Sequence, residues 1–183
     1  DSKPGQVFMG LPHRLDRPVS GITMLAKTSK ALERLNAMFR ESDVHKFYWA
    51  LVCREPQPAE GHLEDMMWRN EKQNKSFVVK ANTKDAKRAV LSYKTIACSE
   101  RYTLLEINLE TGRHHQIRCQ LSAIGCPIKG DLKYGAKRSN PDGGISLHAR
   151  KIEFIHPVSK LPISIEAQVP DDNLWRSLEE SLL

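Results

Sequence analysis

Short apolar runs, and one stretch in which apolar and polar residues alternate, predict mainly strands. Between Tyr102 and Leu109, apolar Leu105 and Ile107 alternate with polar neighbours, which gives a strand one buried and one solvent-facing side. The apolar run 88–98 precedes this strand after a short polar link, so the two are expected to form an antiparallel hairpin. Further strands are expected at 21–27, 47–52, 147–155 and 162–167, and a hairpin with long loops in the polar, weakly patterned residues 59–86.

Helical spacing is confined to a few segments. Thr28 or Ser29 is suited to cap one helix, and Ile117 and Leu121 recur on one side of another. A few helices among several hairpins indicate an α+β fold in a single domain over residues 1–183. The expected helices are 30–41, a second that opens at Thr111 or Gly112 and ends before Gly125, and a capped one from about Asp171.

Composition narrows the class of protein. With 40% hydrophobic and 27% charged residues, the chain of 183 residues has ordinary globular values, and its longest apolar runs are too short to span a membrane. The four cysteines are sparse and unpatterned, which is typical of reduced thiols in a cytoplasmic protein. The chain opens at Asp1 with no leader-like segment, which is consistent with removal of an upstream segment.

The formal net charge is +6, and its distribution is uneven. From Gly112 to Lys151 eight residues are Lys or Arg and two are Asp, whereas the tail from Leu161 to Leu183 is acidic. A basic block inside a folded chain suggests a surface that faces phosphate, although a solvated basic face fits the same count.

The densest candidate for chemistry is the segment 13–21, which reads His-Arg-Leu-Asp-Arg-Pro-Val-Ser-Gly. Asp16 lies between Arg14 and Arg17, and neighbouring positive charge favours the ionised carboxylate. An ionised carboxylate can act as a nucleophile or a base, or stabilise a developing cation. An ion-paired surface loop is the alternative interpretation.

A second candidate is the segment 111–118, Thr-Gly-Arg-His-His-Gln-Ile-Arg, where a strand is expected to run into a helix. Backbone N–H groups and two arginines at such a point could bind a phosphate. On a helix, however, Arg113 and Arg118 would project about 140° apart, so they are not expected to bind the same phosphate. A basic, solvated helix is the alternative here.

The segment 46–49, Lys-Phe-Tyr-Trp, places aromatic rings beside a basic residue. Such rings can stack on an unpaired base, although aromatic residues in a strand belong more often to the core. Strand alternation puts Tyr48 on one face and Phe47 and Trp49 on the other, so one ring can line a site while two pack.

The sequence contains none of the common motifs for a zinc site, a nucleotide-binding loop or a serine hydrolase. The histidines lack the HExxH pattern and the cysteines lack CxxC, so no metal is expected. Neither a GxGxxG nor a GxxxxGK[ST] loop is present, so no nucleotide cofactor is implied. The Gly-x-Ser-x-Gly elbow of serine hydrolases is also missing.

Taken together, these segments resemble the motifs of RluA-type pseudouridine synthases. Residues 13–21 resemble the family's HRLDRxTSG, Tyr48 lies in a Lys-x-Tyr-x-Ala segment at the family's distance from Asp16, and residues 111–118 resemble TGRxHQIR. Residues 125–135 resemble GxPIxGDxxYG, and 147–149 resemble the closing Leu-His-Ala, followed by a His-Pro at 156–157. The five matches occur in the family's order and extend from about residue 10 to 170.

The resemblance implies isomerisation of uridine in RNA, ribosomal or transfer, to pseudouridine, without cofactor or metal. It also implies an α+β fold with a central, mostly antiparallel mixed sheet flanked by helices and loops. Asp16 matches the essential aspartate, which either attacks C1′ or takes a proton from C2′. Tyr48 matches the tyrosine expected to pack on the base and accept the C5 proton, and Arg118 the arginine that pairs with the aspartate. Contacts to RNA or support of the site are expected from His13, Arg14, Leu15, Arg17, Arg113, His115, Gln116 and Leu147.

The chain also departs from the family pattern. Val19 replaces a common Thr, and Cys119 and Gln120 replace a common Val-His pair. The family has a Lys-Pro-Ala-Gly strand well upstream of its HRLD motif, whereas Lys3-Pro4-Gly5 is too close to His13 to be that strand. We therefore expect a monomeric, non-membrane catalytic domain that lacks its N-terminal edge and any S4 RNA-binding domain.

Two other functions remain open from the sequence. A non-catalytic RNA-binding or ribosome-associated protein on the same fold would need no carboxylate like Asp16. A glycosidase would need a second carboxylate near Asp16, and no residue is convincingly placed for that role.

Overall fold

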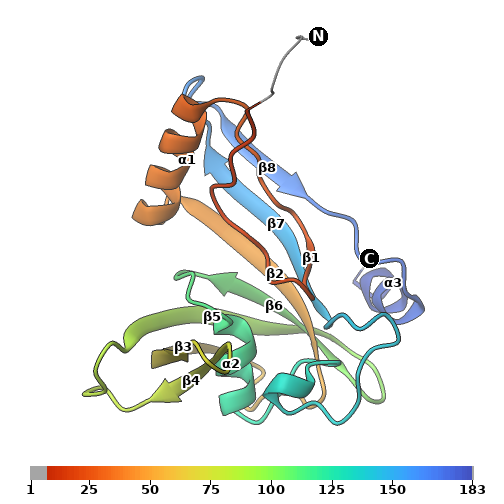
Figure 1. Ribbon diagram of the computed structural model, residues 1–183. Helices are drawn as coiled ribbons and strands as arrows, with labels where there is room; N and C mark the ends of the chain where they lie inside the picture. The colour runs from red at the N-terminus through yellow and green to blue at the C-terminus, as the bar shows by residue number, and fades with distance from the viewer. Residues whose placement is uncertain (1–7, 183) are drawn as a thin grey trace.

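Eight strands form one sheet in the computed structural model, which describes residues 8–182 (Figure 1). The order is β1-β7-β2-β6-β5-β3-β4, and β8 also pairs with β7. Among the described strands, β1 runs parallel to β7 and every other pairing is antiparallel, so the expected mostly antiparallel mixed sheet is confirmed. The strands are β1 (Ser20–Gly21), β2 (Val44–Val52), β3 (Glu60–Asn70), β4 (Lys75–Val79), β5 (Lys87–Cys98), β6 (Thr103–Leu109), β7 (Leu147–Ile155) and β8 (Pro162–Glu166).

The hairpins agree with the sequence pattern, and one is more regular than expected. β5 and β6 pair antiparallel, as do β7 and β8. In the polar stretch 59–86, β3 pairs on one side with β4 and on the other with β5. The expectation of long loops in this hairpin is wrong, because only four residues, 71–74, separate its strands. Asn74 closes that turn with a φ of +45°, a left-handed conformation that Asn tolerates better than most residues.

The strand expected over 21–27 is also wrong in extent, because β1 ends at Gly21. A Cβ at Gly21 would lie 2.3 Å from the Ala149 carbonyl oxygen, and the residue has a φ of +111°. This conformation suits glycine and turns the chain out of the parallel ladder with β7. The chain next pairs at Ala26, which forms an isolated bridge with Gly10.

A β-bulge in β7 shifts the register of its pairing with β2 by one residue. Phe47 pairs with Lys151 and Tyr48 pairs with Ala149, so Arg150 has no partner on β2. The extra residue turns the Arg150 guanidinium over the Trp49 ring, 4.4 Å from its centroid. Bulges re-aim side chains in this way.

Within residues 8–182, three α-helices cover the two faces of the sheet, and a short 3-10 helix, η1 (Leu132–Tyr134), follows α2 (Figure 1). Helix α1 (Ser29–Glu41) has Thr28 as its N-cap and packs Met38 and Phe39 on β2 and β7. Helix α2 (Gln116–Ala123) packs Ile117 and Leu121 into the main core. The residues of β2 that α2 covers include Ala50 and Val52, whereas α3 (Asn173–Glu180) packs on Trp49 and Leu51. Since alternate residues of a strand face opposite sides, α2 and α3 lie on opposite faces.

Helix α2 begins later than the sequence pattern predicts. The expected start at Thr111 or Gly112 is wrong, because residues 111–114 form a loop and the first helical residue is Gln116. His115 precedes the helix with a φ of +53°, so the chain cannot be helical through it. Arg113 therefore lies on a loop, and the angle predicted between it and Arg118 on one helix does not apply. The helix at the C-terminus is confirmed, with Asp172 as its cap.

The described part of the chain holds no helix long and apolar enough to cross a membrane. The Lys3-Pro4-Gly5 segment lies outside the described residues.

Candidate active site

Asp16 lies in a cleft of about 540 Å³ on the face of the sheet that carries α2. The segment before β1, the β2 strand and the loop that leads into α2 all contribute to this cleft. The Asp16 carbonyl accepts the Val19 N–H at 2.9 Å, which forms a tight turn, and the carboxylate is about one-third exposed. The lining includes Pro12, His13, Arg14, Leu15, Val19, Phe39, Arg40, Lys46, Tyr48, Glu110, Thr111, Gly112, Arg113, His115, Gln116, Arg118 and Leu147.

The cation next to Asp16 is Arg118, from the first turn of α2. Its Nη1 lies 3.5 Å from Asp16 Oδ2, and its side chain is buried. Arg118 makes its short hydrogen bonds to Asp131, with Nε donating at 2.6 Å and Nη2 at 2.8 Å. This two-point contact fixes the plane of the guanidinium and leaves its third nitrogen to face Asp16.

Tyr134 contacts both Arg118 and His115. The Arg118 guanidinium lies over the Tyr134 ring, 5.0 Å from its centroid. The Tyr134 hydroxyl accepts the Ser76 N–H at 2.8 Å and contacts His115 Nδ1 at 2.9 Å. Burial raises the pKa of Tyr134 to about 12, so the hydroxyl keeps its proton.

His115 is a second side chain that approaches Asp16, with Nε2 lying 3.6 Å from the same oxygen, Oδ2. Burial, and then the Arg118 charge, lower the pKa of His115 to about 3. At neutral pH the imidazole is therefore uncharged, and its contact with Asp16 is no ion pair. Its ring stacks on that of His114 at 3.7 Å.

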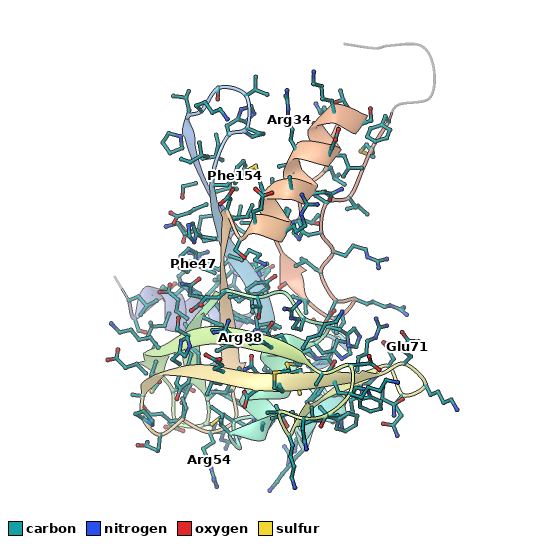
Figure 2. The ribbon with its side chains drawn as sticks, turned by 90° about the vertical axis from the view of Figure 1, so that its left-hand side faces the viewer. Arg34, Phe47, Arg54, Glu71, Arg88 and Phe154 are labelled. Atoms are coloured by element: carbon teal, nitrogen blue, oxygen red, sulfur yellow. The ribbon has the colours of Figure 1, made fainter. Side chains whose placement is uncertain are left out.

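Tyr48 reaches the cleft from the middle of β2. It packs against the main core while Phe47 and Trp49 lie on the opposite side of the sheet, as alternation predicts. Figure 2 shows Phe47 on the far side of the β2–β7 strands from α1. Burial, with the nearby Asp16 charge, raises the pKa of Tyr48 to about 12, so it is a neutral phenol.

His13 holds the Asp16 segment in place. Its Nε2 accepts the Met24 N–H at 3.1 Å, and its ring lies 4.8 Å from the Phe39 ring. Burial, and then the Lys46 charge, lower the pKa of His13. Because its Nε2 already accepts a hydrogen bond, the neutral His13 ring stabilises the conformation of the segment that carries Asp16.

Lys46 is a cation of the cleft without a carboxylate in contact. No acidic oxygen of the described residues lies within 4.0 Å of its Nζ, and burial lowers its pKa. It lies beside Gly112, where a Cβ would be 3.5 Å from the ammonium, and 5.8 Å from the centroid of the Phe39 ring. An uncompensated cation in a cleft attracts an anionic ligand.

The other residues expected at the site divide into two groups. Arg14, Leu15, Arg113 and Leu147 line the cleft, whereas Arg17 is exposed and lies outside its lining. Gln116 is buried, and its Oε1 accepts from the Thr111 hydroxyl and the Arg113 N–H while its Nε2 donates to the Val90 carbonyl. Gln116 therefore shapes the loop 111–115.

Sequence reasoning missed Asp131, Tyr134 and Lys46 as members of the site. Asp131 and Tyr134 belong to the Gly-Asp-x-x-Tyr-Gly motif at 130–135, so a signal existed in the motif without a role attached to it. Lys46 stands two residues before Tyr48, and strand alternation places both on one face. Within residues 8–182, no group of three or more His, Cys, Asp or Glu side chains is arranged to hold a metal ion.

Comparison with known proteins agrees with the fold and the motifs. The family model described as RNA pseudouridylate synthase matches residues 2–123. The chain is 35% identical to the uncharacterized RNA pseudouridine synthase YlyB of Bacillus subtilis, over 92% of this chain and 54% of that protein. It is 32% identical to ribosomal large subunit pseudouridine synthase D of Zymomonas mobilis, over 89% of this chain and 53% of that protein.

The solved structure of human RNA pseudouridylate synthase domain containing 4 superposes with a TM-score of 0.75 at 24% identity, over 95% of this chain and 76% of that one. The chain spans about half the length of the curated relatives it matches. The extent of the family match, together with relatives above 30% identity, settles the classification: this chain belongs to the RNA pseudouridylate synthase family.

Proposed function

We propose that the protein isomerises uridine in RNA to pseudouridine, with Asp16 as the catalytic carboxylate. The observation that carries the proposal is the surroundings of Asp16. It is a partly exposed carboxylate that faces a buried arginine, and that arginine is itself fixed by Asp131. A carboxylate aimed in this way can stabilise or capture positive charge that develops at C1′ of a ribose.

The reaction is an isomerisation and needs no co-reactant other than water. The N1–C1′ bond breaks, the base turns, and C5 bonds to C1′, while the C5 proton passes to water and N1 takes up a proton from water. Asp16 either attacks C1′ or takes a proton from C2′. Arg118 faces the carboxylate and would orient it for both routes.

The cleft offers groups for the rest of the nucleotide. The Tyr48 ring would pack on the base, since a phenol that stays neutral is a poor proton acceptor but a good stacking surface. Lys46, Arg14 and Arg113 line the cleft and would meet phosphates on either side of the target. These contacts would offset the few kcal/mol needed to take a base from its stack.

The proposed substrate is structured RNA, ribosomal or transfer. The relatives named for the large ribosomal subunit favour ribosomal RNA.

The described cysteines are unpaired thiols, two of them exposed, which suits the reducing cytoplasm. We expect the protein to act as a monomer, since the groups named here all come from one chain.

The test is Asp16→Asn, assayed by tritium release from RNA labelled at C5 of uridine. We expect the variant to fold and bind RNA but to release no tritium, whereas Asp142→Asn, on an exposed loop outside the cleft, releases it at the wild-type rate. Wild-type turnover by Asp16→Asn would refute the role of Asp16. An inactive wild-type protein that still binds RNA would favour a non-catalytic RNA-binding function instead. Mapping pseudouridines in cellular RNA with and without the gene would identify the target.

A further inference from the structure

His115 contacts Asp16, yet the reaction described above gives it no task. It is buried, it precedes α2 in a left-handed conformation with a φ of +53°, and it lies between Tyr134 and Asp16. A non-glycine residue in that conformation is strained by about 1 kcal/mol or more and persists where its surroundings over-determine it.

The hydrogen bonds of Tyr134 decide which nitrogen of His115 carries the proton. The Tyr134 hydroxyl accepts the Ser76 N–H, and its own proton has one neighbouring acceptor among the described residues, His115 Nδ1 at 2.9 Å. If Nδ1 were protonated instead, two protons would compete for that contact and a buried O–H would have no acceptor. The proton of the neutral ring therefore resides on Nε2.

The surroundings of Nε2 agree with this assignment. Nε2 faces Asp16 Oδ2, and a bare nitrogen lone pair turned toward a carboxylate oxygen would be repelled. Arg118 Nη1 approaches the same oxygen, at 3.5 Å. Both distances are longer than a hydrogen bond, and contacts of this kind shorten in many enzymes as the substrate binds. For both side chains the shorter approach is therefore to Oδ2 rather than to Oδ1.

We propose that His115 is a positioning residue whose Nε2–H, set by Tyr134, acts with Arg118 to hold one oxygen of Asp16, so that the other oxygen is the atom that acts on the ribose. This inference rests on the proposed catalytic role of Asp16. A neutral imidazole suits the task, because it orients the carboxylate without giving it a proton.

Two substitutions separate positioning from a structural role. In His115→Gln the side-chain N–H₂ lies near the position of Nε2 and can still reach Asp16, whereas the amide of His115→Asn ends near Nδ1 and cannot. Asn tolerates the left-handed backbone better than Gln, so a purely structural role predicts that the Asn variant is the better one. Positioning predicts the reverse order in kcat.

We expect His115→Asn to lower kcat about 10- to 100-fold with the KM for RNA nearly unchanged, the loss of one hydrogen bond to a charged group. His115→Gln should recover most of that loss. Tyr134→Phe keeps the ring under Arg118 but removes the hydroxyl, and it should also lower kcat. Wild-type kcat in His115→Asn, or a kcat for His115→Asn equal to or above that of His115→Gln, would overturn the proposal.

A measurement without RNA tests the geometry separately from the activity. A ¹H–¹⁵N correlation spectrum of the histidine rings should show the His115 proton on Nε2 in the wild-type protein and a mixture of the two forms in Tyr134→Phe. A proton on Nδ1 in the wild-type protein would overturn the proposal even if the enzyme is active. A proton on Nε2 in a protein without synthase activity would uphold this geometry and refute the proposed function alone.

Discussion

Arg118 binds Asp131 with two short hydrogen bonds and turns only its remaining nitrogen toward Asp16. The contacts to Asp131 are 2.6 and 2.8 Å, and the contact to Asp16 is 3.5 Å. The side chains of Arg118 and Asp131 are 6% and 1% exposed, so their charges compensate each other away from water. The orientation of the Arg118 guanidinium is thus set by a carboxylate that does not line the cleft.

Replacement of Asp131 should therefore affect both stability and activity. Asp131→Asn leaves the buried Arg118 charge without its partner, and the loss of one member of a buried pair costs about 3–5 kcal/mol. We expect a lower midpoint of urea unfolding and, below that midpoint, a reduced kcat. Glu64→Gln is the matched control, because Glu64 holds Arg88 through the same two-point geometry at the surface and its loss should hardly move the midpoint. Equal effects of the two substitutions would contradict this account.

The proposed stacking by Tyr48 can be measured as binding. Tyr48→Phe keeps the ring and should leave the Kd for RNA unchanged. Tyr48→Ala should weaken binding by about 1–3 kcal/mol, the contribution of one stacked base. Because the pKa of Tyr48 is about 12, neither kcat nor binding should show a tyrosine titration between pH 7 and 9. A Tyr48→Phe variant that binds RNA normally but has a low kcat would show that the hydroxyl also takes part in the chemistry.

The role proposed for Lys46 predicts a change in salt dependence. If its ammonium meets a phosphate, Lys46→Met should weaken RNA binding and lower the slope of log Kd against log salt by about one. Lys94→Met is the control, since Lys94 lies on β5 at a hollow on the opposite face with Phe47. An unchanged slope in Lys46→Met, or an equal change in Lys94→Met, would contradict a phosphate contact at Lys46.

The depressed pKa of His115 makes folding stability depend on pH. In the unfolded chain this histidine binds a proton near its ordinary pKa of 6.5, whereas in the folded protein it stays neutral down to a pKa of about 3. Since the unfolded state binds more protons in this window, the contribution is complete above pH 6.5 and is lost as the pH falls toward 3, by at most about 1.4 kcal/mol per pH unit.

His115→Gln removes this titration. Urea unfolding at pH 7 and pH 5 should show a smaller loss of stability for His115→Gln than for the wild-type protein. His114, whose pKa burial also lowers, is the control. Because His114 is more exposed, His114→Gln should change the pH dependence less. An identical pH dependence in wild type and His115→Gln would show that His115 titrates normally in the folded protein.

Local pattern was enough to predict much of this protein. Short apolar runs located most of the strands. Period-two alternation supported the strand at 102–109 and put Tyr48 on the face opposite Phe47 and Trp49, because a side chain's face depends only on its place along its own strand. Capping residues located α1 and α3 for a similar reason, since a cap is satisfied within one turn. The motif segments at 13–21 and 111–118 placed Asp16 and Arg118 among the candidates before any distance was known.

The tertiary structure decided what the pattern could not. It ended β1 at Gly21, where close approach to Ala149 requires glycine, and it delayed α2 to Gln116, because contacts with Tyr134 and Asp16 hold His115 in a left-handed conformation. It also gave Arg118 its main partner, Asp131, and made His115 a neutral donor. These outcomes depend on residues that are far apart along the chain and on their removal from water, whereas periodicity records which face a residue occupies but not what it meets there.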